Sequence, residues 1–69
     1  MSLRFSPPDL IRLRTDAGKS RDDLARATGR TWWAVQTWEL GSAVPGGDSL
    51  AAIADALGCP IDDLFTKED

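Results

Sequence analysis

Two adjacent tryptophans and two hydrogen-bonding side chains lie close together in the middle of the sequence. They are Trp32, Trp33, Gln36 and Thr37. On a helix, Thr31, Val35 and Trp38 share one face, which we expect to enter the core. Trp33 and Thr37 then point the other way, and the remaining two candidates lie on the flank. Because an outward tryptophan is unfavourable unless something covers it, the pattern predicts a binding surface.

Ordinary packing offers a second interpretation of each tryptophan. Trp38 is explained by the core alone. Trp32, on the flank, fits a core position or a surface position equally well. Trp33 is the hardest to place in a core, and the alternative for it is an incidental surface aromatic.

Residues suited to catalysis or metal binding are scarce. The sequence has no histidine, the commonest general base and metal ligand, and it has no glycine-rich phosphate-binding pattern. Its single cysteine, Cys59, precedes Pro60 in an apolar context and is expected in the core. Asp62 and Asp63 fall in the first turn of a short predicted helix, where carboxylates favour the helix dipole. We therefore expect no enzymatic activity, no metal and no cofactor.

Length and composition indicate one small globular domain. The 69 residues are 42% hydrophobic and 28% charged, and we expect a core from about residue 7 to 65 with short flexible termini. One cysteine allows no internal disulfide, and no apolar run is long enough to cross a membrane. The first residues contain no apolar signal region. A cytoplasmic protein is the expected class.

Charge is divided unevenly along the chain. The net charge is −3, but residues 1–38 carry seven basic and four acidic side chains, whereas residues 39–69 carry one basic and seven acidic. Such asymmetry is compatible with a phosphate-facing half and a solvent-facing or partner-facing half. Scattered solvated charge is the alternative, and Arg12 and Arg14 are expected either to pair with Asp9 and Asp16 or to stay solvated.

Five segments have helical periodicity, and the first four are bounded by capping residues. Ser6, Ser20, Thr31 and Asp48 are the expected N-caps, Ser20 with Asp23 in a capping box. Four glycines follow the segments and suit left-handed helix ends: Gly18, Gly29, Gly41 and Gly58. The predicted helices span residues 7–17, 21–28, 32–40, 49–57 and 61–65. The sequence therefore predicts an all-α fold, a compact bundle of five helices, followed by a frayed tail at residues 66–69.

An ordered set of residues from Leu10 to Phe65 carries a family resemblance. It comprises Leu13-Arg14, Leu24-Ala25, Gly29, Val35, Trp38-Glu39-Leu40-Gly41, Pro45, Leu50, Ile53, Ala54, Leu57-Gly58 and Ile61 to Leu64. At these spacings the chain resembles the helix-turn-helix domain of the phage repressor and Cro family, the XRE-like or lambda repressor-like domains. The resemblance implies a DNA-binding transcriptional regulator on double-stranded DNA, whose third helix enters the major groove while the second lies across the backbone.

The same resemblance assigns roles to side chains. Base contacts fall to Trp32, Trp33, Gln36 and Thr37. Gln36 is suited to a bidentate contact with adenine, and the tryptophans are suited to packing on thymine methyl groups. The phosphate contacts it implies come from Arg21, Arg26, Arg30 and Thr31. Glu39 is expected to bond within the fold, because phosphates repel a carboxylate.

The family resemblance also implies a homodimer, and this sequence departs from the family pattern at several positions. Members often dimerise through the C-terminal region, which here presents Ile61, Leu64 and Phe65. The family often has glutamine where Arg21 stands, and polar side chains where the two adjacent tryptophans stand. Gly46-Gly47 makes the loop after the third helix looser than usual.

A different function remains open for the same surface. Tryptophan is enriched in protein interfaces, so Trp32 and Trp33 can instead anchor a partner protein, as in an antitoxin or antirepressor. The acidity of the chain and its unusual third helix favour this alternative. The two functions differ in salt dependence, because DNA binding releases counterions and aromatic docking does not.

Overall fold

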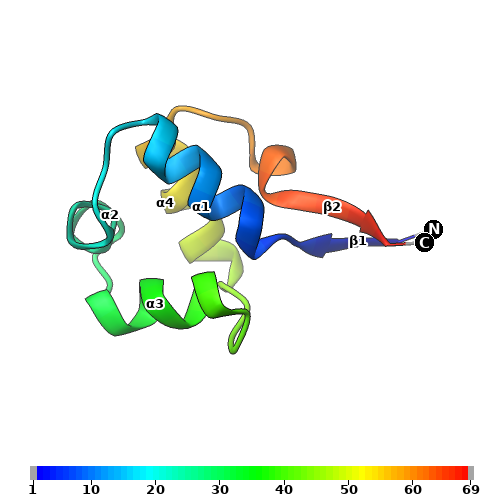
Figure 1. Ribbon diagram of the computed structural model, residues 1–69, viewed down its shortest axis with the longest axis horizontal. Helices are drawn as coiled ribbons and strands as arrows, with labels where there is room; N and C mark the ends of the chain where they lie inside the picture. Colours follow the sequence, from blue (N-terminus) through cyan, green and yellow to red (C-terminus); the bar gives the residue numbers. More distant parts are fainter. Residues whose placement is uncertain (1, 69) are drawn as a thin grey trace.

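Four α-helices pack around one core, and a short two-stranded sheet extends from one end (Figure 1). The computed structural model describes residues 2–68. The elements in chain order are β1 (Ser2–Phe5), α1 (Pro7–Asp16), α2 (Arg21–Thr28), α3 (Trp32–Leu40), α4 (Gly47–Leu57), the 3-10 helix η1 (Ile61–Leu64) and β2 (Phe65–Glu68). None of the helices in this range is long and apolar enough to span a membrane.

Local capping chemistry explains where most helices begin. Ser6 caps α1, Thr31 caps α3, and Ser20 forms the predicted capping box with Asp23 at the start of α2. The four glycines predicted to end helices all have positive φ. Asp48 was the wrong cap for α4: that helix begins at Gly47, after Gly46, without a side-chain cap.

The chain ends form a sheet that the sequence did not predict. β1 and β2 are antiparallel, with Phe5 opposite Phe65, and their rings meet edge to face at a centroid distance of 6.4 Å. The Ser6 amide continues the pairing by donating to the Leu64 carbonyl at 2.8 Å. Within residues 2–68 the two ends of the chain thus lie in paired strands, which the sequence did not predict, and their flexibility stays a prediction. Asp69, the last residue of the predicted tail, lies outside the described residues.

The compact helical fold is as predicted, but residues 2–68 contain four α-helices and not the five that the sequence predicts. Residues Ile61–Leu64 form only a 3-10 turn, after which Phe65 is extended. The Asp63 amide donates to the Pro60 carbonyl at 3.1 Å, which closes the 3-10 turn, and four residues are too few for a stable α-helix. The pairing of Phe65 with β1 then extends the chain.

The core lies between the helices and the base of the sheet. Its buried hydrophobic residues are Phe5, Leu10, Leu24, Ala25, Val35, Trp38, Ile53, Ala54 and Leu64. Cys59 packs against this cluster but stays half-buried, so the prediction that it is a core residue is only partly right. Burial, with a smaller contribution from the charge of Asp63, raises the pKa of the Cys59 thiol.

Candidate nucleic-acid interface

The two sides of α3 differ in burial as the spacing predicts. Val35 and Trp38 are buried in the core. Trp33 lies on the opposite side and is 71% exposed, and Leu40 is similarly exposed. Thr31 is exposed, which corrects its predicted place on the core face. It precedes the helix in extended conformation, where its hydroxyl accepts a hydrogen bond from the Ala34 amide at 3.1 Å.

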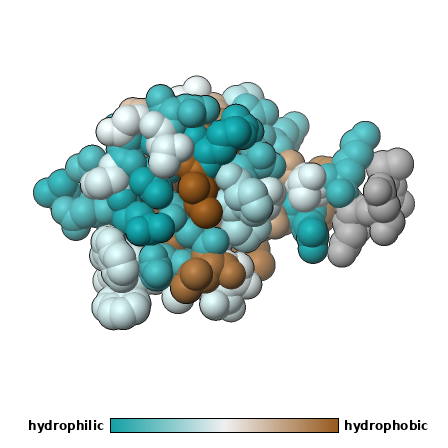
Figure 2. Space-filling view, viewed as in Figure 1, coloured by the Kyte–Doolittle hydropathy of each residue, from teal (hydrophilic) through white to brown (hydrophobic). Residues whose placement is uncertain are grey.

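The adjacent tryptophans form one aromatic surface at the start of α3. Their rings meet edge to face with centroids 5.2 Å apart, and Trp32 is 39% exposed. Figure 2 shows pale and brown side chains along the edge of the molecule where Figure 1 draws α3. Leu40 and Val44 extend the exposed apolar surface toward the loop after the helix. An exposed apolar surface of this kind adds little to the stability of the fold, and it is typical of a site where a partner binds.

Gln36 and Thr37 are only partly exposed on this helix. The Gln36 side-chain oxygen is buried and has no hydrogen-bond partner among residues 2–68. An unpaired buried acceptor costs about 1–3 kcal/mol. The Thr37 hydroxyl donates to the Ala34 carbonyl at 2.8 Å, a bond within the helix. Both side chains therefore have to reorient to present their full hydrogen-bonding capacity to a ligand.

A buried carboxylate, Glu39, joins three helices. Its Oε2 accepts a hydrogen bond from Arg14 Nε at 2.6 Å, and its Oε1 accepts from Arg14 Nη2 at 3.3 Å. Arg21 Nε, from the first residue of α2, donates to the same Oε1 at 2.8 Å. Arg14 Nη1 also donates to the Lys19 carbonyl at 2.9 Å. Glu39 thus bonds within the fold as predicted, and it fixes α1, α2 and α3 relative to one another.

The two arginines of α1 have different surroundings. Arg12 is exposed and pairs with Asp9 at 3.2 Å and with Asp16 at 4.0 Å, which is the predicted surface pairing. The same expectation was wrong for Arg14, which is buried. Position 14 lies one helical turn after Leu10 and so shares its core-facing side.

The other two candidate phosphate ligands, Arg26 and Arg30, are also paired. Arg26 Nη2 lies 2.9 Å from Asp23 and 3.3 Å from Asp22, in an exposed cluster that reduces its net positive charge. Arg30 Nε donates to the Ser49 hydroxyl at 3.1 Å and so joins the turn before α3 to α4. The sequence alone did not identify these acidic neighbours as competitors for Arg26.

The predicted dimer residues are divided between core and surface. Leu64 is fully buried in the core of its own domain, which removes it from any face available to a partner. Phe65 is half-buried against Phe5, and Ile61 is exposed. Leu3 on β1 is a further exposed apolar residue. The error at Leu64 arises because η1 packs against α1 and α4, which turns that side chain into the core.

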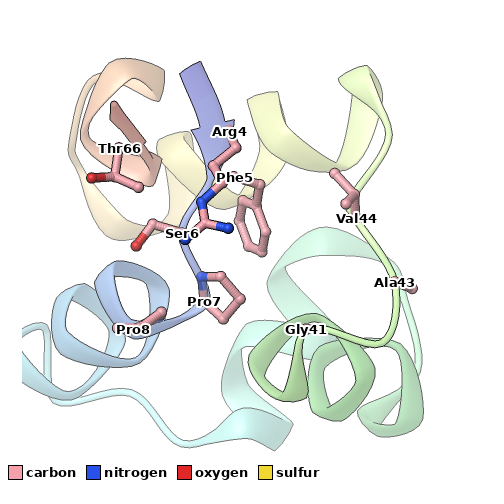
Figure 3. A pocket seen from close by; sticks show the side chains of 9 residues that line it. All are labelled: Arg4, Phe5, Ser6, Pro7, Pro8, Gly41, Ala43, Val44 and Thr66. Atoms are coloured by element: carbon pink, nitrogen blue, oxygen red, sulfur yellow. The ribbon is translucent and has the colours of Figure 1, made fainter. Parts of the chain in front are cut away.

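A hollow of about 470 Å³ lies where β1 enters α1. Figure 3 shows Phe5 and Pro7 on one side of it and the loop with Ala43 and Val44 on the other. Arg4, Ser6 and Thr66 also line the hollow, so its lining is mixed, polar on the side of the strands and apolar at Phe5, Pro7 and Val44. Among the described residues no cluster of histidine, cysteine, aspartate or glutamate is suited to hold a metal ion.

The arrangement of α2, α3 and their turn is that of a known domain. Residues 9–69 match the family model of the Cro/C1-type HTH DNA-binding domain. The chain belongs to this family. Within this Cro/C1-type domain, Gly29 ends α2 in the left-handed conformation and Thr31 caps α3, so two residues separate that glycine from the second helix of the helix-turn-helix. No match to the sequence was found among curated proteins.

Two solved structures are similar to this Cro/C1-type domain over most of its length. One is the crystal structure of the P22 c2 repressor protein in complex with synthetic operator 9T in the presence of Tl⁺. It has a TM-score of 0.82 and 24% identity, covering 88% of this chain and 92% of that chain. The other is the nuclear magnetic resonance structure of the DNA-binding domain of the P22 c2 repressor (1–76). It has a TM-score of 0.83 and 25% identity, covering 93% and 84%.

Proposed function

We propose that this domain is a sequence-specific DNA-binding transcriptional regulator of the cytoplasm, with α3 in the major groove. The observation that carries the proposal is the outer surface of α3. Most of the Trp33 side chain and part of the Trp32 side chain are exposed there, in a family of DNA-binding domains. One similar structure, of a repressor, is a complex with operator DNA. The proposed action is binding alone, with no chemical step.

Sequence readout falls to the four side chains at the start and middle of α3. The indole rings of Trp32 and Trp33 offer apolar contact to thymine methyl groups, and Thr37 offers a hydroxyl. Gln36 binds adenine by accepting from N6 and donating to N7, so its amide turns outward on binding. The unpaired state of its buried oxygen favours that rotation.

Backbone contacts position the helix in the groove. We assign them to Arg21, Arg26, Arg30 and Thr31, which lie in α2 or in the turn before α3. Arg26 is the weakest of these because two aspartates already neutralise it. The Thr31 hydroxyl caps α3, where the amides at the helix start also attract a phosphate.

A homodimer completes the proposal. Two recognition helices in successive major grooves lie about 34 Å apart, which a two-fold dimer provides. The exposed apolar residues at the sheet end, Ile61 and Leu3, are the proposed contacts, beside the half-buried Phe65. Sedimentation of wild type and Ile61→Glu, with and without DNA, tests this interface. Unchanged dimerisation by the variant argues against it.

Selection of duplexes from a random DNA pool, followed by sequencing, tests the function. We expect an enriched inverted repeat. With that repeat in hand, Gln36→Ala should relax base preference at one position of each half-site, whereas Arg26→Ala should weaken all sequences alike. Absence of enrichment by a folded sample contradicts DNA binding.

The exposed apolar residues beyond the reading positions favour a second candidate function. Leu40 and Val44 are about as exposed as Trp33, and α3 contains no lysine or arginine that could contact phosphate. A partner protein that presents an apolar helix fits this surface. Leu40→Ser should then abolish partner binding, with little dependence on salt, and leave DNA binding nearly unchanged.

A further inference from the structure

Arg21 occupies a position where its charge is unfavourable by local rules. It is the first residue of α2, at the end of a helix where the dipole is already positive. Its guanidinium is nevertheless held in place, because Nε donates to Glu39 Oε1 at 2.8 Å. Glu39 therefore compensates the local cost, and a cation is held where a helix N-terminus attracts anions.

The rest of the Arg21 guanidinium is open to a ligand. The side chain is 40% exposed, and its two Nη groups have no hydrogen-bond partner within residues 2–68. Arg14 already matches the single negative charge of Glu39 through two hydrogen bonds. The three side chains together thus carry one net positive charge, and its exposed part is the Arg21 fork.

Because a guanidinium is rigid, the hydrogen bond between Arg21 and Glu39 also fixes the direction of the rest of the Arg21 group. Its N–H groups are coplanar and fixed relative to one another, so anchoring Nε also sets where the Nη groups point. A lysine ammonium at the same position is a single charge on a flexible stem. It can pair with Glu39 or with a phosphate, but it cannot hold both in a set geometry.

We propose that Glu39 is a positioning residue for DNA: it orients Arg21 so that the Nη groups bind a backbone phosphate beside the start of α2. The inference rests on the DNA-binding function proposed above and adds a defined role for a carboxylate that contacts no DNA. Arg14 holds Glu39 from the core side, so the packing of α1 and α3 determines the direction of a surface contact.

The first test is Arg21→Lys, which keeps the charge and leaves the buried Arg14–Glu39 pair intact. On the duplex enriched by selection, we expect about tenfold weaker binding, as for loss of one charge-assisted hydrogen bond. Where the lysine pairs with Glu39 and leaves the phosphate, the salt dependence becomes shallower by about 0.9 in the logarithmic slope, or about 3.5-fold between about 50 and 200 mM salt. Arg12→Lys is the matched control and should bind as wild type, because Arg12 has only surface partners.

The second test asks whether Glu39→Gln strengthens or weakens DNA binding. By charge alone, removing a carboxylate near phosphates tightens DNA binding; if the carboxylate orients Arg21, its removal weakens binding. We expect weaker binding, measured at a temperature where circular dichroism shows a folded sample, and no further weakening when Glu39→Gln is added to Arg21→Lys. Tighter binding would overturn the inference.

If the Glu39→Gln variant does not fold, the Arg21→Lys variant still tests the proposal. Wild-type affinity and salt slope in Arg21→Lys overturn the positioning role while leaving DNA binding in place. Failure of the wild type itself to enrich any duplex defeats the proposed function, and the inference with it.

Discussion

Leu24, Val35 and Trp38, on the inner surfaces of α2 and α3, are buried in the core, whereas Trp33 and Leu40, on the outer surface of α3, are mostly exposed. Each inner side chain has a packing neighbour or an ion partner that explains its type. Trp33 and Leu40, by contrast, leave about two thirds or more of their surface in solvent, although the Trp33 ring packs on Trp32. The nine residues of α3 thus serve two separate purposes: its inner side chains hold the fold together, and its outer side chains are available to a ligand.

The largest expected effect is a difference in unfolding free energy between substitutions on the inner and outer surfaces of α3. Trp38→Ala removes a buried aromatic side chain and should destabilise the fold by about 3–5 kcal/mol. Trp33→Ala, its matched control on the outer surface, should change the unfolding free energy by less than about 0.5 kcal/mol. Urea unfolding followed by circular dichroism measures both. Similar losses from the two variants would show that the outer tryptophan also supports the fold.

The next effect concerns the buried ion pair on the inner side. Arg14→Met leaves Glu39 without its bidentate partner and should cost about 3–5 kcal/mol, because an incompletely paired buried charge is left behind. Arg12→Met breaks only exposed pairs and should cost about 0–1 kcal/mol. Thermal unfolding of the two variants provides the measurement. Equal shifts would mean that the buried network has no special part in stability.

A smaller effect should appear in binding alone. Trp33→Ala should weaken binding to the selected duplex by about tenfold or more, since a fully buried aromatic contact is worth about 1.5–3 kcal/mol. Trp33→Phe retains an aromatic ring and should recover most of the affinity. Fluorescence anisotropy with a labelled duplex measures both. Unaltered binding by Trp33→Ala would move this residue to the protein-partner function.

The smallest expected effect lies at the start of α2 and depends on pH. Hydrogen bonds from the Ser20 backbone and side chain, together with Arg26, lower the pKa of Asp23. A carboxyl whose pKa falls on folding stabilises the fold above its unfolded pKa of about 3.9, and this contribution is lost as the pH drops through the lower folded value.

Asp23→Asn should therefore be less stable than wild type at neutral pH, and the difference should shrink in acid. Urea unfolding of both proteins over a pH series from neutral to strongly acidic gives the comparison. A difference that stays constant with pH would exclude the ionised carboxylate as its source.

Structural features that depend on residues close together in the sequence were predictable, whereas features that depend on distant residues were not. The ends of α1, α2 and α3 depend on caps within a few residues, such as Ser20 with Asp23, and these were predicted correctly. The sheet was missed because Phe5 and Phe65 meet only through tertiary contact, and strands of four residues carry too little alternation to reveal themselves. Leu64 was misassigned for the same reason.

The candidate interface was predictable in outline for a related reason. Helical spacing alone placed Trp33 outward and Trp38 inward. Spacing could not reveal that Arg21 bonds to Glu39, since the two residues meet across a helix–helix contact. Nor could it reveal that the Gln36 oxygen is buried without a partner. Pair geometry between elements needs the assembled fold.

The terminal sheet has a consequence for the order of folding. Pairing Ser2–Phe5 with Phe65–Glu68 closes nearly the whole chain into a loop, whereas the contacts between α2 and α3 are local. Closure of a long loop is entropically costly, and a two-stranded ribbon is weak alone. We expect the strands to join last and separate first. Amide hydrogens of the ribbon should then exchange with solvent much faster than those of α3, through openings that leave the helices folded.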